Sequence, residues 1–346
     1  MVAALAAVPP RGLCGERAPG ERWPCDNTGL VYLWENSSAQ NEAGQGRMCI
    51  PDARDAATFG RYGVMDLVGG SLVAGPESDA ELLDACRKSG AFSLEALVQP
   101  ECVDLSDPTA IISFSADGKC NFALGMVKNK LVMRLRTSQN EPDPPIEFGI
   151  LKAKTPQHVI VTFEAGKLIC YVDGKSRTKD ITLKGDLQAW TPAHLAFGDK
   201  IWPGTLEGIA IYSRALDANE AATHYKGYVA RLEKRQPAHR VVMDAKLFDI
   251  TPNSTPEAIK PYRRLLLLDN YEVVKVVDGK CDDKKISVAR WGILDDKVLK
   301  LKREKGKIYR LVLEPWSENE QLESERSLNS TEDLTLPVYY NVDKRP

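Results

Sequence analysis

Apolar and polar residues alternate with a period of two over a large part of the chain. In one segment, Phe92, Leu94, Ala96 and Val98 occupy every second position, and mostly polar residues stand between them. This period is typical of a β-strand that buries one face and exposes the other. The pattern predicts a strand with one buried face over residues 92–99.

Further short apolar segments precede and follow this strand, and turn-forming residues separate them. Asp117-Gly118 and Asp173-Gly174 are two of these breaks, and Asp-Gly favours the positive φ angles of tight hairpin turns. Many short strands at this spacing predict an antiparallel sandwich or barrel rather than a βαβ fold. The other expected strands are residues 29–34, 62–67, 71–74, 110–115, 121–126, 131–137, 158–163, 168–172, 194–197 and 206–212.

One segment between these strands has the start and stop signals of a helix. Residues 78–88 begin with Ser78 and Glu81 at the spacing of a capping box. Gly90 follows at the position of a left-handed C-terminal residue. We therefore expect a helix whose first free N–H groups bond to the Ser78 hydroxyl.

A second helix is expected after the last of these strands. Asp217 and Glu220 repeat the capping-box spacing, and the helical pattern continues to about residue 235. The charged end of this helix is followed by Pro237. We interpret residues 230–238 as the helix end and a linker.

Short strands resume beyond the linker. Lys and Arg are dense on alternate positions of residues 297–310, and acidic residues 314–325 follow at once. We interpret the basic segment as the solvated face of a small antiparallel sheet, and not as a nucleic-acid surface. The expected strands are residues 241–250, 264–268, 271–277, 285–291, 297–301, 307–313 and 336–342.

Length and charge narrow the class of protein. The 346 residues exceed the roughly 250–300 at which single cores usually divide. A formal net charge of -2 argues against a nucleic-acid or anionic-membrane partner, and no apolar run approaches the roughly 20 residues of a membrane span. We expect an all-β protein with a β-sandwich and two flanking helices over residues 29–229, and a small antiparallel barrel or sandwich over 239–346. Residues 1–28 are expected to be a disordered or signal-derived tail.

The eight cysteines show no zinc or haem spacing. Cys14, Cys25 and Cys49 lie in Gly/Pro-rich segments, where an exporting cell could bridge them. Cys120 and Cys170 fall inside apolar strand patterns, and we expect them to be small buried hydrophobic residues. The cysteines therefore leave the redox compartment open.

Four stretches of the chain resemble the laminin-G-like jelly-roll family of the concanavalin A-like lectin/glucanase superfamily. They are RYGVMDLVGGSLVAG, AFSLEALVQP, HVIVTFEAGKLICYVDGK and HLAFGDKIWPGTLEGIAIYSRALDANEAATHY. The last stretch is the most specific, because a strand ending in IY is followed by R-A-L and a short helix. The resemblance covers about half of the chain. It implies an antiparallel jelly-roll β-sandwich, often secreted and usually non-catalytic, that binds glycans or proteins, sometimes through calcium.

The closing strand departs from the family pattern at one acidic position. Relatives often carry the form G-x-I-D-E, whereas this chain has Gly204-Thr205-Leu206-Glu207-Gly208. One carboxylate is therefore missing from any calcium site that the resemblance implies. We predict that the remaining candidates for calcium are Asp66 and Glu207, on strands that are neighbours in related sandwiches.

Exposed aromatic rings often stack on sugars, and two tryptophans are candidates for this role. Trp190 and Trp202 flank one expected strand, residues 194–197. They are thus expected at opposite ends of it, and a single platform built from both is not expected. The alternative for each ring is a place in the core or at its rim, and Trp34 and Trp291 are interpreted as core.

The sequence contains no motif that establishes an enzyme. The four histidines have neither HxxxH nor HxH spacing, and each is interpreted as structural. Sandwich glucanases place carboxylates at alternate positions of one strand, as E-x-D-x-E, and no expected strand has this pattern.

Three functions fit these sequence observations. The leading hypothesis is a non-catalytic binding or adhesion module of an exported protein, secreted, periplasmic or on the cell surface, that recognises a glycan or protein partner. A glycan hydrolase or lyase on the same fold is the first alternative. A structural part of a larger assembly, docked through residues 239–346, is the second. The sequence establishes no cofactor, and calcium is the one candidate.

Overall fold

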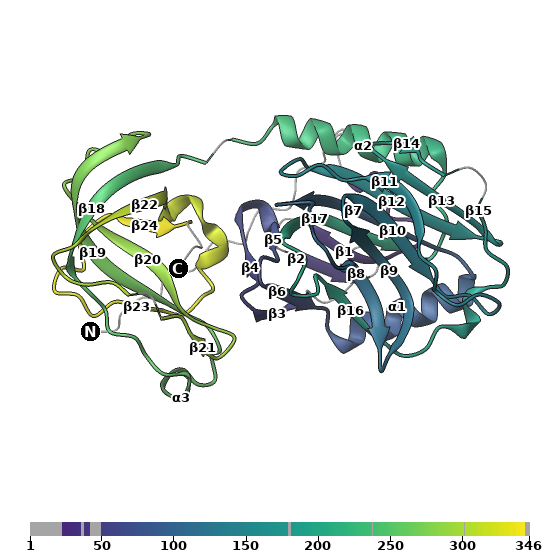
Figure 1. Ribbon diagram of the computed structural model, residues 1–346, viewed down its shortest axis with the longest axis horizontal. Helices are drawn as coiled ribbons and strands as arrows, with labels where there is room; N and C mark the ends of the chain where they lie inside the picture. The colour runs from purple at the N-terminus through teal and green to yellow at the C-terminus, as the bar shows by residue number, and fades with distance from the viewer. Residues whose placement is uncertain are drawn as a thin grey trace, which may run out of the picture.

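Two β-structured parts make up the chain, and they lie side by side along its long axis (Figure 1). The structure is a computed structural model that describes residues 23–35, 38–41, 50–178, 181–236, 238–300 and 302–342. The expected tail over residues 1–28 therefore lies mostly outside the described residues. Trp23, inside that range, is buried against the first part of the molecule.

The first part is a sandwich of two antiparallel sheets. Sheet A has the order β14 (Lys175–Ser176), β13 (Lys167–Val172), β12 (Gln157–Glu164), β7 (Phe92–Pro100), β17 (Gly204–Tyr212), β1 (Leu30–Glu35) and β2 (Ser38–Asn41), with β15 (Ile181–Thr182), β5 (Met65–Asp66) and β4 (Thr58–Phe59) attached. Sheet B has the order β11 (Ile146–Ile150), β10 (Lys130–Leu135), β9 (Lys119–Val127), β8 (Thr109–Ala116), β16 (His194–Phe197), β6 (Gly70–Val73) and β3 (Asp52–Asp55). The antiparallel sandwich expected from the strand pattern is confirmed.

The space between the two sheets is filled by alternate side chains of the strands. Phe92 of sheet A stacks on Phe122 of sheet B, with ring centroids 5.4 Å apart. Trp190 packs edge-on against Phe92 and Phe114. Interlocking aromatic rings of this kind contribute about 0.5–1.5 kcal/mol per pair beyond the burial of their area. The aromatic residues of the strand pattern thus hold the sandwich together.

The expectation that β7 exposes one face is wrong. Ser93, Glu95 and Leu97, which alternate with the core residues, are also buried. The reason is α2 (Ala218–Glu233), which packs over the outer face of sheet A (Figure 1). An apolar layer of Leu97, Ile160, Ala221 and Tyr228 fills the space beneath it.

The first helix, α1 (Pro76–Ser89), begins two residues earlier than expected. Gly75 is its N-cap, no side chain caps it, and Ser78 lies inside the helix. The expected Ser78 cap is therefore wrong: Pro76 starts the helix instead, since its fixed φ suits the first helical turn. Gly90 adopts the expected left-handed conformation, with φ of 69°.

The second helix begins as expected. The Asp217 carboxylate accepts hydrogen bonds from the Asn219 and Glu220 N–H groups at 2.7 and 2.8 Å, and Glu220 accepts from the Asp217 N–H at 2.8 Å. This capping box satisfies N–H groups that have no partner within the helix.

Of the helices in the described part of the chain, none combines the length and apolar character needed to cross a membrane.

The second part is a small β-barrel. Its strands follow the order β20 (Lys285–Leu294), β24 (Val338–Asn341), β22 (Ile308–Pro315), β18 (Val241–Asp249) and β19 (Leu265–Asp278), and β19 closes the ring by pairing with β20. The β20–β24 pair is parallel and the other pairs of the ring are antiparallel. The two strands expected over residues 264–268 and 271–277 are one continuous, bulged strand. Shorter elements complete this part: β21 (Lys297–Val298), β23 (Ser327–Leu328), α3 (Pro256–Ile259), η3 (Trp316–Glu318) and η4 (Glu320–Leu322).

A buried ion pair joins β19 and β20 inside the barrel. Arg290 Nε donates to Asp269 Oδ2 at 2.6 Å, and the side chains are 4% and 0% exposed. The second oxygen of Asp269 accepts from the Thr251 N–H at 2.9 Å. The carboxylate is thus fully engaged in a place where an unpaired charge would be costly.

The backbone around Gly70 leaves no room for a side chain. A Cβ at this position would lie 2.1 Å from the Ala57 nitrogen and 2.5 Å from the Arg54 oxygen, both of them backbone atoms. We expect Gly70→Ala to lower the free energy of unfolding of the sandwich by about 1–3 kcal/mol, because the backbone must shift. Urea denaturation followed by tryptophan fluorescence measures this change. Gly60→Ala is the matched control, since its nearest neighbours lie at 3.7 Å, and an equal loss in both variants would contradict the explanation.

Candidate functional site

The two tryptophans proposed as sugar platforms lie inside the sandwich. Trp190 is 1% exposed and Trp202 is 0% exposed. A ring without an accessible face cannot stack on a ligand at the surface. Both tryptophans therefore belong to the core, as the alternative prediction stated, and neither is a sugar-stacking platform. Trp34 and Trp291 are also buried in the core.

The two candidate calcium ligands lie on paired strands, as expected. Asp66 of β5 is opposite Thr205 of β17, two residues before Glu207. The Glu207 carboxylate, however, is held by Arg231 and Arg235, at 3.0 Å from Arg231 Nη2 and 2.8 Å from Arg235 Nη1. No group of three or more His, Cys, Asp or Glu side chains that suits a metal ion is found in the described ranges. The calcium site stays a prediction, and it would have to displace these arginines.

A buried polar cluster lies between sheet A and α2. Glu95 is 0% exposed and accepts hydrogen bonds from His158 Nε2 at 2.6 Å, from His224 Nδ1 at 2.8 Å and from Trp23 Nε1 at 2.6 Å. The ionised carboxylate is an acceptor only, so both ring nitrogens facing it carry protons. Two of the histidines interpreted as structural thus belong to one charged core cluster that joins β7, β12, α2 and the segment before β1.

The protonation of this cluster follows from its hydrogen bonds. Burial alone would raise the pKa of Glu95, but the hydrogen bonds and charges of His158 and His224 lower it to about 2. Burial alone would lower the pKa of His224, but the hydrogen bond and charge of Glu95 raise it above the usual range. The cluster therefore contains a carboxylate and an imidazolium that stabilise each other.

We expect the stability of the sandwich to fall at low pH and again at high pH. Glu95 stabilises the fold fully above its unfolded pKa of about 4.3, and this contribution is lost as pH falls toward its folded value. His224 stabilises it fully below its unfolded pKa of about 6.5, and this contribution is lost as pH rises through its raised folded value. We expect the urea midpoint of the sandwich to be highest between these limits. In His224→Gln the fall above pH 6.5 should flatten; an unchanged fall would contradict this assignment.

A cleft of about 370 Å³ lies between the sandwich and the barrel. Three segments far apart in the sequence line it: residues of the segment 58–66 in the sandwich, Gln236, Ala238 and Arg240 after α2, and residues between 314 and 342 of the barrel. Ligand pockets in proteins typically have volumes of about 300–1,000 Å³ and often lie between domains. This cleft is therefore our candidate functional site.

The sandwich wall of the cleft is built around Tyr62, in η1 (Arg61–Gly63). This residue has a left-handed φ of 58° and its side chain is partly exposed. Its hydroxyl donates to the Gln236 carbonyl at 3.2 Å, and the guanidinium groups of Arg61 and Arg235 lie 5.3 and 4.7 Å from its ring centroid. These contacts fix the ring against the segment that leads into the barrel.

The barrel wall of the cleft contains a second arginine and a buried carboxylate. Arg240 Nη2 donates to Glu314 Oε1 at 2.9 Å; the Arg240 side chain is 57% exposed and that of Glu314 is 5% exposed. Gln321 Nε2 donates to Asn319 Oδ1 at 2.9 Å, and Asn319 Nδ2 to the Pro315 carbonyl at 3.0 Å. Burial raises the pKa of Tyr340, another residue of this wall, to about 12, so its hydroxyl stays protonated at neutral pH.

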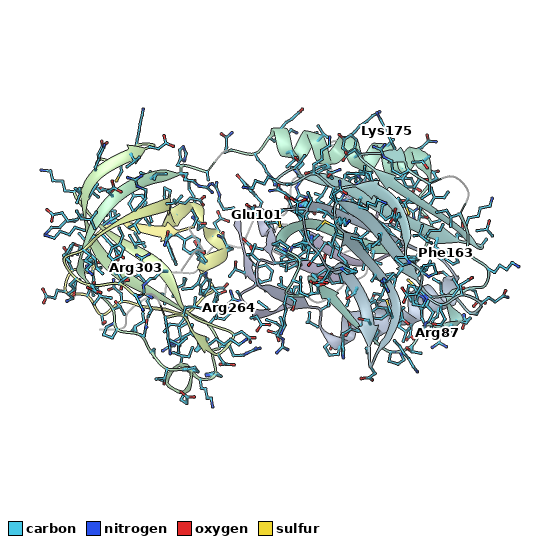
Figure 2. All side chains as sticks on the ribbon, in the orientation of Figure 1. Arg87, Glu101, Phe163, Lys175, Arg264 and Arg303 are labelled. Carbon is cyan, nitrogen blue, oxygen red and sulfur yellow. The ribbon has the colours of Figure 1, made fainter. Side chains whose placement is uncertain are left out.

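An ion pair on one side and hydrogen bonds on the other hold the walls in place. On one side, Arg61 of the sandwich pairs with Glu318 of the barrel at 3.1 Å. On the other, the Asp55 N–H donates to Asp295 Oδ2 at 2.7 Å, and Arg264 Nη1 donates to the Ala57 carbonyl at 3.0 Å. Figure 2 places Arg264 on the side of the barrel that faces the sandwich. The cleft is thus formed by two folded units whose relative position is set by direct contacts.

Comparison with known families identifies the sandwich. Residues 75–222 match the Laminin_G_3 family model, described as the concanavalin A-like lectin/glucanases superfamily. The matched residues form most of the sandwich, which we call the laminin-G-like domain. The resemblance expected from the strand and closing-segment motifs is thereby confirmed for this part of the chain. No curated protein matches the sequence.

Two of the solved structures that match the chain have low sequence identity and TM-scores below 0.5. A Trypanosoma rangeli sialidase in complex with sialic acid is 18% identical, with a TM-score of 0.42, over 58% of this chain and 33% of the sialidase. The chain thus spans about a third of that enzyme. The binding domain of botulinum neurotoxin DC, solved in complex with rat synaptotagmin II, is 12% identical, with a TM-score of 0.47, over 83% of this chain and 77% of that domain.

Proposed function

We propose that this chain is a non-catalytic binding module of an exported protein, which recognises a glycan or protein partner in the cleft between the laminin-G-like domain and the barrel. The observation that carries the proposal is the cleft itself. It is a concave space lined by charged and amide side chains and bordered by two β-structured units. A few fixed polar groups in a largely preformed cleft are the usual architecture of a ligand site.

The lining residues that the structure describes have no thiol, amine or imidazole group, and their possible nucleophiles are hydroxyls and carboxylates. Among the lining residues in the described part of the chain there is no His, Cys, Ser or Lys. Nucleophilic catalysis commonly uses such groups beside a general base. The Glu95 cluster does contain two imidazoles, but it is buried under α2, away from solvent. A structural role for that cluster is consistent with its complete burial.

A glycan-degrading enzyme is the second candidate, and one observation favours it. Asp66 of the laminin-G-like domain and Glu314 of the barrel both line the cleft. Most glycoside hydrolases use two carboxylates on either side of the scissile bond. Turnover would release shorter sugars, whereas a binding module would return the glycan intact.

The test is a binding screen of the full chain. The probes are an array of neutral and acidic glycans and a panel of purified collagen, fibronectin and laminin, each with calcium and with a chelator. We expect saturable binding to at least one probe and no shorter products by mass spectrometry. Cleavage of a glycan would establish the enzyme alternative. Absence of binding to every probe would overturn the proposal.

A further inference from the structure

We propose that the cleft binds the end of an uncharged oligosaccharide, with neighbouring hydroxyls held by the Arg240–Glu314 pair. This inference rests on the proposed function and narrows it to one ligand class and one recognition pair. It is carried by the charge balance of the cleft, the hydrogen-bonding capacity left on its polar side chains, and its mixture of polar and apolar surface.

The charges that line the cleft cancel. Two arginines, Arg61 and Arg240, stand against two carboxylates, Asp66 and Glu314. Arg240 is paired with Glu314, and Arg61 is paired with Glu318 just outside the lining. A cleft without net charge provides no field that concentrates an ionic ligand. An uncharged ligand therefore fits better than a phosphate, a sulfate or an acidic sugar.

The Arg240–Glu314 pair has the capacity to bind a further group. Arg240 uses one of its five N–H groups on Glu314, and its side chain is more than half exposed. In the described ranges, Glu314 Oε2 and Gln321 Oε1 accept no hydrogen bond from a protein group. A hydroxyl can donate and accept at once, so two adjacent hydroxyls can accept from the guanidinium and donate to the carboxylate. Hydrogen bonds to charged groups are the stronger ones.

Apolar side chains complete the lining. Phe59, Tyr62 and Val64 contribute from the laminin-G-like domain, and Val342 contributes from the barrel. A sugar ring has the same two kinds of surface, with hydroxyls at its rim and C–H groups on its faces. The C–H face can pack against the apolar residues while the hydroxyls reach the Arg240–Glu314 pair.

The size of the cleft favours a glycan over a protein surface. Stable protein–protein interfaces bury about 1,200–2,000 Å² and are anchored by aromatic residues in well-packed pockets. Here the space is about 370 Å³, and Tyr62, its one aromatic ring with substantial exposure among the described lining residues, is already held by two arginines and Gln236. A small ligand or the end of a chain can enter such a space, whereas a flat protein surface cannot.

The experiment compares the full chain with three variants on a glycan array, followed by titration calorimetry of any neutral oligosaccharide that binds. Arg240→Gln and Glu314→Gln change the recognition pair. Arg310→Gln is the matched control, because Arg310 is also exposed and pairs with Asp244 between β18 and β22, outside the cleft, whereas Arg240 directly precedes β18 and Glu314 lies in β22. We expect Arg240→Gln and Glu314→Gln to weaken binding by about tenfold or more, and Arg310→Gln to leave it within about twofold.

Each other outcome is informative. Selective binding of acidic glycans would overturn the ligand class. Neutral-glycan binding that is equal in all variants would overturn the location and leave the proposed function standing. Binding to a panel protein that Arg240→Gln weakens, without glycan binding, would overturn the glycan class and keep the protein form of that function. Circular dichroism confirms folding; if Glu314→Gln does not fold, Arg240→Gln alone decides, because its side chain is exposed.

Discussion

Replacing Glu95 with glutamine is expected to lower the free energy of unfolding of the laminin-G-like domain by about 3–5 kcal/mol. The carboxylate accepts hydrogen bonds from Trp23, His158 and His224 in a fully buried place. An amide has one accepting oxygen and would turn its NH₂ group toward a ring that also donates. The variant therefore leaves buried donors without acceptors and removes the counter-charge of His224.

Hydrogen exchange of peptides from residues 91–172, measured across a urea titration, reports the stability of this domain separately from the barrel. Glu147→Gln is the matched control, because Glu147 pairs with Lys130 at 2.6 Å on the exposed edge of sheet B. Exposed pairs contribute little, so its effect should be much smaller. Equal effects of the two substitutions would show that the cluster under α2 contributes no more than a surface pair.

A second large loss is expected in the barrel when Asp269 is replaced with asparagine. Arg290 is buried, and its Nη1 already lacks a hydrogen-bond partner within the described residues. Loss of the carboxylate leaves this cation without its counter-charge, which typically costs about 3–5 kcal/mol. Exchange of peptides from residues 265–294 across the same urea range measures the change.

The double variant Asp269→Leu/Arg290→Met separates pairing from packing. Replacing both partners of a buried ion pair with apolar residues is often neutral or stabilising, so this variant should be more stable than Asp269→Asn. Asp244→Asn, at the exposed Arg310 pair, is the control with little expected effect. If the double variant were less stable than Asp269→Asn, packing of the side chains rather than charge would explain the loss.

The sequence predicts the sandwich well because its strands carry their own signals. Alternation over residues 92–98 places Phe92 and Leu94 in the core, and Asp-Gly pairs occupy hairpin turns with positive φ at Asp117 and Asp173. The capping box at Asp217 is likewise a local pattern. Features of this kind depend on a few neighbouring residues, so periodicity and turn chemistry are enough to find them.

The same alternation misleads about Glu95. A carboxylate at an outward position predicts solvent exposure, and the covering residue His224 lies 129 positions further along the chain. A helix on the outer face of a sheet has no local signal in the strand that it covers. The amphipathic pattern of residues 217–233, with His224 four residues before Tyr228, is the one hint that this helix packs on something.

Asp66, predicted as a calcium ligand, lines the cleft, but the rest of the candidate site was missed for a related reason. Tyr62, Arg240 and Glu314 come from three segments, and none of them has a motif. Trp190 and Trp202 were predicted to bind sugars because exposed aromatic rings often do, but both are buried in the core. The residues next to Trp190 and Trp202, Ala189 and Ile201, do not show which way each ring points. Only the packing of one unit against the other brings the polar residues of the cleft together.

The position of β24 makes the cleft a product of the whole fold. This strand lies between β20 and β22 in the ring, and Tyr340 and Val342, in or next to it, line the cleft. A copy in which this strand has not docked can have a formed laminin-G-like domain but lacks part of the lining of the candidate site. Under the proposed function, a copy in which β24 has not docked would not bind the ligand. Ligand binding would therefore distinguish chains with a complete barrel from chains without one.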